Sequence, residues 1–222
     1  DAKAGSVLDL NGGALTVKDG GTSAGSLRGE GTLRADAGEL AIRGANAELH
    51  AQTSIGESAR VVLDDTAGLG DGAIAVAGAL DVDGAAGTLV NALSGAGTVN
   101  LMNSATVVAT GDNSAFAGEL ATEKGTTLTV AQANHLGAAK LANDGKLIVN
   151  TSTDWTLANA MTGTGDLIKD GAGALTAGDS LRHTGKTAVE AGTLIVGDAA
   201  RPGVMLGATD AGEVTVAEGA TL

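Results

Sequence analysis

The chain has 222 residues, of which 36 are glycine, with one proline, one tryptophan, one phenylalanine and no cysteine. Its net charge of −13 argues against nucleic-acid binding, and the missing cysteine excludes disulfide scaffolds, thiolate metal sites and cysteine nucleophiles. No apolar run approaches the ~20 residues of a membrane helix, whereas 43% hydrophobic against 18% charged residues predicts a folded aliphatic core.

The beginning of the chain, Asp1-Ala2-Lys3, does not resemble an export signal, because no basic region precedes an apolar stretch. We therefore expect residues 1–222 to form a single fragment of a longer protein. The export signal and any translocator or anchor are expected to lie outside this fragment.

The sequence repeats itself with a period of about 67 residues. Similar phrases begin at Leu27, Leu93 and Met161, and each contains two glycines separated by one residue. The internal repeats therefore cover about residues 27–92, 93–160 and 161–222. Residues 1–26 are expected to be the end of an earlier repeat.

Within each repeat, pairs such as Leu-x-Val alternate apolar and polar positions, a pattern that predicts short β-strands with one buried face. Small side chains and regular repetition favour stacked coils over a sandwich or barrel. We expect an all-β parallel β-helix of about ten coils of roughly 22 residues, three coils per sequence repeat. The predicted core residues are Val61, Leu63, Leu80, Val82, Leu128, Val130, Leu147, Val149, Leu194 and Val196.

Glycine and asparagine separate the predicted strands and are typical of sharp corners, where they supply positive φ angles. Positive φ is expected in particular at Gly97, Gly165 and Gly192. The full set of predicted repeat turns is Gly29, Gly31, Gly95, Gly97, Gly163, Gly165, Gly171, Gly173 and Gly192.

The third repeat contains the phrase Gly163-Thr-Gly-Asp-Leu-Ile-Lys-Asp-Gly-Ala-Gly-Ala-Leu175, followed by Gly185-Lys-Thr-Ala-Val-Glu-Ala-Gly-Thr-Leu194. This sequence resembles the autotransporter-associated β-strand repeat, although the usual aromatic residue of the bridge is absent. The resemblance implies a right-handed parallel β-helix in the passenger of a type V secreted autotransporter, on the surface of a Gram-negative bacterium. It implies the adhesin and self-association branch, rather than the protease branch.

Side chains that could act in catalysis or bind a metal ion are few in this sequence. His50, His135 and His183 stand alone, without a catalytic or metal-binding spacing. Asp64-Asp65 and Asp81-Val82-Asp83 are the densest acidic clusters, and either a weak Ca²⁺ site or a solvated acidic face fits them. We favour the solvated face, with Asp81 and Asp83 pointing outward.

Two further asparagines, Asn91 and Asn159, lie four residues before repeat glycines and predict an asparagine turn or ladder.

The sequence therefore predicts a protein that is not an enzyme, with no catalytic, cofactor-binding or metal-binding residues and no cofactor. The expected function is adhesion, either cell–cell self-association in a biofilm or attachment to a host extracellular-matrix protein. A stalk that carries a distal functional region is the alternative, and a glycan-active β-helix enzyme is a third, less favoured one. Neither nucleic acid nor a membrane is an expected partner of this fragment.

Overall fold

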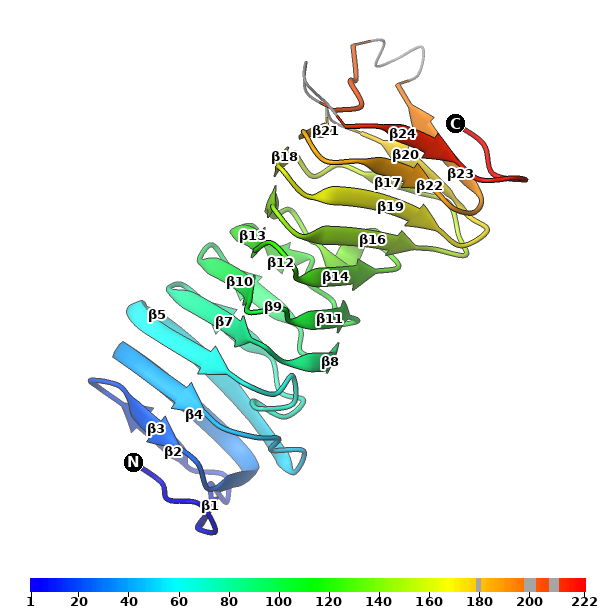
Figure 1. Ribbon diagram of the computed structural model, residues 1–222. Coiled ribbons are helices and arrows are strands. Elements are labelled where there is room, and N and C mark those ends of the chain that lie inside the picture. The colour runs from blue at the N-terminus through cyan, green and yellow to red at the C-terminus, as the bar shows by residue number, and fades with distance from the viewer. Residues whose placement is uncertain (179–180, 198–202, 208–211) are drawn as a thin grey trace.

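The computed structural model describes residues 1–178, 181–197, 203–207 and 212–222. Within these residues the chain forms an elongated β-solenoid of about nine turns without an α-helix. Strands of successive coils stack along the rod, and the two termini lie at its opposite ends (Figure 1). The strand ladders run parallel, which confirms the predicted fold class.

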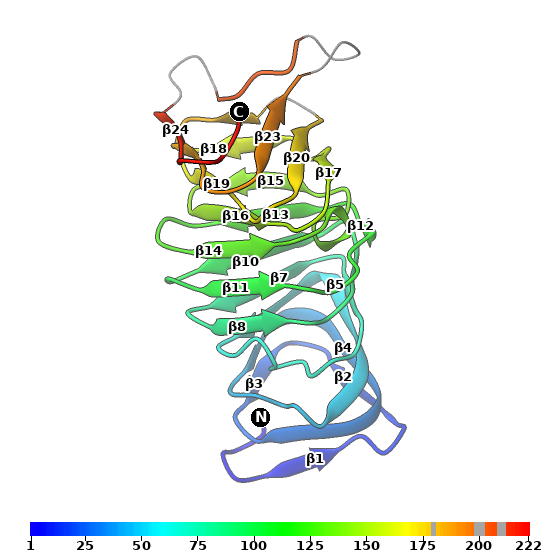
Figure 2. The ribbon, with the colours of Figure 1, turned by 90° about the vertical axis from the view of Figure 1, so that its right-hand side faces the viewer.

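The largest sheet, here called the main sheet, contains fourteen strands. In the N-terminal half, two long strands bend around the rod and run along more than one side of it (Figure 2). The strands are β1 (Val7–Asp9), β2 (Ala14–Val17), β3 (Gly21–Ser23), β4 (Ser26–Ile42), β5 (Leu49–Leu63), β6 (Ile74–Val76), β7 (Ala79–Asp83), β9 (Leu93–Gly95), β10 (Thr98–Met102), β12 (Ala115–Phe116), β13 (Glu119–Thr122), β15 (Lys140–Asn143), β18 (Met161–Gly163) and β21 (Leu181–His183).

Two smaller sheets complete the wall of the rod, and a short 3₁₀ helix, η1 (Ala133–His135), interrupts it. The second sheet consists of β8 (Ala86–Leu89), β11 (Thr106–Ala109), β14 (Thr127–Val130), β16 (Lys146–Asn150), β19 (Asp166–Asp170), β22 (Thr187–Val189) and β24 (Val214–Val216). The third sheet consists of β17 (Trp155–Leu157), β20 (Ala174–Ala177) and β23 (Thr193–Val196).

The length of one coil follows from the register of these ladders. Leu80 pairs with Val99, and Val99 pairs with Leu120 on the next coil. One coil therefore takes about 20 residues, slightly fewer than expected, and the 67-residue sequence period corresponds to about three and one-third coils. The expectation of three whole coils per sequence repeat was wrong.

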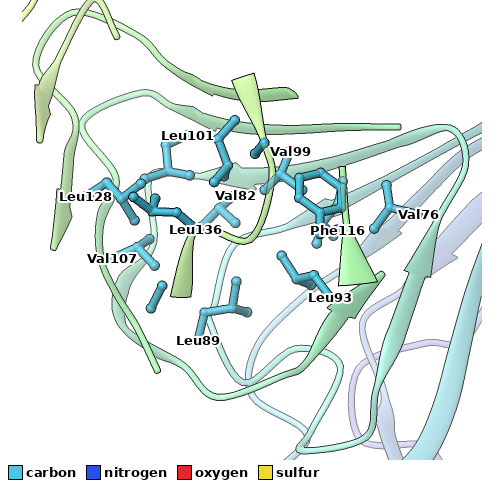
Figure 3. Packing of buried hydrophobic residues seen from close by; sticks show 14 of the residues in the cluster. Val76, Val82, Leu89, Leu93, Val99, Leu101, Val107, Phe116, Leu128 and Leu136 are labelled. Atoms are coloured by element: carbon cyan, nitrogen blue, oxygen red, sulfur yellow. The ribbon is translucent and has the colours of Figure 1, made fainter. Parts of the chain in front are cut away.

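Because of this mismatch, equivalent residues of successive repeats lie on different sides of one interior. Val61 lies in β5 of the main sheet, Leu128 in β14 of the second sheet and Leu194 in β23 of the third. All three belong to a single hydrophobic core, and the other predicted core residues are buried as well, except Val196, which is partly buried. Aliphatic side chains from all sides meet in this interior, together with Phe116 (Figure 3).

Glycines at the predicted corners serve two different purposes. Gly95, Gly163 and Gly192 have φ angles of 99°, 111° and 68°, a region that L side chains rarely adopt. Gly97 and Gly165 do not have a positive φ, contrary to expectation. Instead, their α-carbons lie against the coil before them.

The remaining predicted turn glycines divide in the same way. Gly29, Gly31 and Gly171 have a positive φ. Gly173 does not, but a Cβ there would lie 2.4 Å from the carbonyl oxygen of Thr153.

Buried asparagines bond the corners of neighbouring coils to one another. The Asn46 side chain accepts a hydrogen bond from the Leu27 amide at 2.7 Å and donates to the Gly68 carbonyl at 2.7 Å. One sequence repeat later, Asn113 makes the equivalent bonds. It accepts from the Leu93 amide at 2.8 Å and donates to the His135 carbonyl at 2.7 Å. Asn91 and Asn159 each donate to two carbonyls of the preceding coil. These bonds satisfy backbone groups that strand pairing leaves without a partner.

We predict that Gly165→Val lowers the free energy of unfolding by about 1–3 kcal/mol, because a Cβ would lie 2.2 Å from the carbonyl oxygen of Gly145. Urea unfolding followed by circular dichroism measures the change. Gly203→Val is the control, since a Cβ there meets nothing within 4 Å. Equal stability of the two variants would contradict the explanation from crowding.

A second prediction concerns Asn113→Ala, which leaves the Leu93 amide and the His135 carbonyl without their bonds to the side chain. We expect a loss of roughly 2–4 kcal/mol in unfolding free energy. Asn150→Ala, in an exposed position of β16, should change it by less than about 0.5 kcal/mol. The same urea titration compares the two, and a small effect at Asn113 would refute the role in joining coils.

Candidate functional site

The outer face of the second sheet carries aligned columns of side chains, one residue per coil. On each strand of this sheet, alternation points one residue into the core, such as Val107, Leu128 or Leu147. The residues immediately before and after it on the same strand therefore face outward. One outward column contains Thr106, Thr127, Lys146, Asp166, Lys186 and Glu213, and its neighbour contains Thr88, Val108, Thr129, Ile148, Ile168, Ala188 and Thr215. Residues in one column are about 4.8 Å apart.

The outer face of the main sheet contains a shallow groove of about 380 Å³ with a floor of small residues that includes Ala79, Ala121 and Ala142. At one end, the Arg60 guanidinium forms an ion pair with Asp81, and its Nη2 lies 3.9 Å from the Met102 sulfur. Arg60 therefore reaches across coils along the rod.

Asp81 points away from the core, as predicted, but it is not solvated. Its side chain is completely buried beneath Arg60 and accepts a 2.6 Å hydrogen bond from the Asn100 amide. The expectation of a solvated acidic face was wrong here, because the long arginine side chain of the preceding coil covers the carboxylate. Sequence reasoning missed Arg60, because the coil length of about 20 residues that places it beside Asp81 follows only from the strand register.

The other acidic residues of the predicted clusters accept hydrogen bonds, two of them from an adjacent coil. Asp64 accepts from the Gly44 amide at 2.6 Å, Asp65 from the Ala67 amide at 2.8 Å, and Asp83 from the Asn103 side chain at 2.6 Å. In the part of the chain that the structure describes, no group of three or more potential ligands is placed to hold a metal ion.

The three histidines lie in different environments. His50 is exposed, and its Nδ1 lies 2.7 Å from Asp71, whose hydrogen bond and charge raise the pKa of His50. His135 is the last residue of η1, and it accepts a hydrogen bond from the Ala131 amide. His183 is fully buried, with Nε2 2.9 Å from the Thr187 hydroxyl. Burial lowers the pKa of both His135 and His183.

Lys169, the lysine of the family-like phrase, is also buried. Its ammonium group donates to the carbonyls of Asp170, Gly171 and Ala191 at 2.8, 2.8 and 3.0 Å. These three bonds match the three donors of an ammonium group. Burial lowers the pKa of Lys169. The contacts indicate that Lys169 fastens the corner between two coils.

Comparison with known proteins identifies relatives of unassigned activity. No family model matches the chain, and no solved structure matches it significantly. The chain is 40% identical over 194 residues to the uncharacterized lipoprotein YdeK and 43% identical over 203 residues to the uncharacterized protein YuaQ, both of Escherichia coli (strain K12). The matches cover 87% and 91% of this chain but 15% of each relative.

The chain therefore spans about 15% of the length of the curated relatives it matches. Among the residues whose placement is described, no helix is long and apolar enough to cross a membrane.

We predict that acid destabilises the fold as the pH falls below 6.5, through His135 and His183. Their folded-state pKa values lie below the unfolded value of 6.5, so the unfolded chain takes up protons first as the pH falls. Their contribution is complete above pH 6.5 and is lost below it. Urea unfolding at each pH measures the slope. His183→Gln should flatten it, and His50→Gln should not.

A further prediction is that Arg60→Met lowers the free energy of unfolding by about 3 kcal/mol, since it leaves the buried Asp81 without its counter-charge. Arg28→Met is the matched control, because Arg28 and its partner Asp9 are 47% and 45% exposed. That change should be below about 1 kcal/mol. Equal thermal and urea stability of both variants would argue against a structural role for Arg60.

Proposed function

We propose that this chain is part of a rigid, non-enzymatic rod that a bacterium displays on its surface, and that the rod joins cells by binding further copies of itself. The observation that carries the proposal is the outer face of the second sheet, where seven parallel strands present aligned outward residues. A surface of this kind presents outward side chains for contact on every coil.

Because contacts are repeated along the rod, individually weak contacts are sufficient for self-association. A neutral hydrogen bond contributes about 0.5–1.5 kcal/mol, and micromolar affinity requires about 8 kcal/mol. Several coils in register can reach this value, and linked contacts gain further strength from their high effective concentration. Self-association therefore needs no deep pocket.

Two observations support a place on the cell surface. One relative is described as a lipoprotein, which favours attachment to the bacterial envelope. The phrase from Gly163 to Leu194 resembles the repeats of autotransporter passengers, which favours export by type V secretion. Both observations favour display on the bacterial surface.

The groove on the main sheet favours a structural interpretation over glycan cleavage. Its buried carboxylate, Asp81, is already paired with Arg60 and hydrogen-bonded to Asn100. An acid–base catalyst must instead exchange a proton with the substrate.

A salt series separates homotypic adhesion from attachment to host matrix. Two rods of net charge −13 repel one another, and 0.1 M salt confines that repulsion to about 10 Å. We therefore expect self-association of the purified chain in sedimentation to strengthen from 10 to 100 mM salt. Binding to a basic patch of an immobilised matrix protein should weaken over the same range.

Clumping of cells that display the full-length protein provides the second readout. We expect clumping when the protein is displayed and none in cells that lack it. A chain that stays monomeric at every salt concentration, on cells that do not clump, would refute self-association and favour the stalk.

A further inference from the structure

We propose that the groove on the outer face of the main sheet binds an extended, basic segment of another polypeptide. The groove lies outside the second sheet, on which the proposed function rests, so it adds a second and different binding surface to the rod. Its strands β7, β10 and β13 follow one another along one side of the rod (Figure 1), and β15 continues them.

The first observation is the shape of the groove in cross-section. Ala121 of β13 and Ala142 of β15 form the floor, and both are partly exposed. Longer side chains stand two residues before and after Ala121, at Glu119 and Glu123, and face the same side of the sheet. Four residues of strand separate these two walls by about 13 Å, whereas an extended chain occupies about 5 Å. The groove is therefore wide enough for one extended segment.

The second observation is the direction of the groove, which runs along the rod and across the strands. Its floor passes from Asn100 to Ala121 and then to Ala142 on successive coils. Arg60, ion-paired with Asp81, lies at the end nearer the N-terminus. From the coil of Asp81 to that of Ala142 the length is roughly 15 Å, which four or five extended residues span.

The third observation is the charge of the walls. Glu119, Glu123 and Asp144 are exposed, and none of the ion pairs among the described residues includes them. Lys140 on the wall of Glu119 compensates for one of these charges, and the charge of Arg60 is already balanced by Asp81. The groove therefore has an excess of negative charge, on a chain whose net charge is −13.

Hydrogen bonds hold two of these polar side chains in place. Asp144 accepts 2.8 Å hydrogen bonds from the amide and the hydroxyl of Thr164, and it keeps its negative charge at the wall. The Asn100 side chain donates its N–H to Asp81, which leaves its carbonyl oxygen on the floor to accept from a backbone amide. A backbone amide is a property of a polypeptide, and a simple polyamine lacks it.

A basic segment complements this arrangement. Extended residues i and i+2 point to the same side about 7 Å apart, and residue i+1 points to the opposite side. Lysine or arginine at i and i+2 reaches Glu123 and Asp144 on one wall, while i+1 faces Glu119 on the other. Exposed ion pairs contribute little individually, so we expect weak binding that salt weakens further.

Fluorescence anisotropy of a labelled peptide tests the charge of the site. The probe is an octapeptide of alternating lysine and alanine, and the wild-type chain should bind it but not its glutamate–alanine counterpart. Glu123→Gln combined with Asp144→Asn should weaken binding at least tenfold, and asparagine still accepts from Thr164. The matched control combines Glu190→Gln with Glu218→Gln, two exposed positions outside the groove, and should change binding less than twofold.

Chemical labelling tests the location independently, because the chain has no cysteine. Ala142→Cys should react rapidly with the same peptide carrying a bromoacetyl group. Ala188→Cys, an equally partly exposed position of the second sheet, should react at least tenfold more slowly. Circular dichroism verifies that all variants fold.

The outcomes either support or overturn the proposal. Equal weakening by the two double variants, or equal labelling of the two cysteines, would mean a general attraction to an acidic rod, and the groove would be wrong. If spermine, which carries the same four positive charges, competes at the concentration of the peptide itself, the site recognises a polyamine instead. Absence of binding also overturns the proposal. Self-association is unaffected by each of these results, because the second sheet is unchanged in the groove variants.

Discussion

The close approach of one coil to the next is the constraint on which this structure depends. A carbonyl oxygen of the coil below lies 2.2–2.3 Å from the place that a Cβ would occupy at Gly97 and Gly165. Glycine allows this spacing, and the spacing allows Asn46 and Asn113 to bond to both neighbouring coils. The interior is then narrow enough for Leu, Val and Ile to fill.

Period-two patterning and internal repetition made the fold class predictable, because every coil imposes the same alternation on its residues. The side of the rod on which each repeated residue lies was not predictable. A Leu-x-Val pair packs equally well on any side of this interior, so the sequence does not indicate that Val61, Leu128 and Leu194 lie on three different sheets. Likewise, glycine is compatible with both a positive φ and a crowded position, and composition cannot distinguish Gly95 from Gly97.

The candidate surface could be predicted only in part from the sequence. Outward threonines such as Thr127 and Thr129 are visible in the alternation, but the neighbours of a residue on adjacent coils depend on a coil length that varies with each turn. The covering of Asp81 by Arg60 arises in this way, since the two residues lie on adjacent coils. Once the register is known, the surface can be described as columns, and charge order along a column becomes a property that selection can act on.

The direction of the strand ladders has a mechanical consequence. In a solenoid the hydrogen bonds between coils run along the rod axis, so a pulling force on the two ends of the rod opens them one coil after another. Each coil that peels away releases about 20 residues, or roughly 65 Å of extended chain, in exchange for about 5 Å of rod. A rod of this construction therefore lengthens in steps under load and absorbs work at each step.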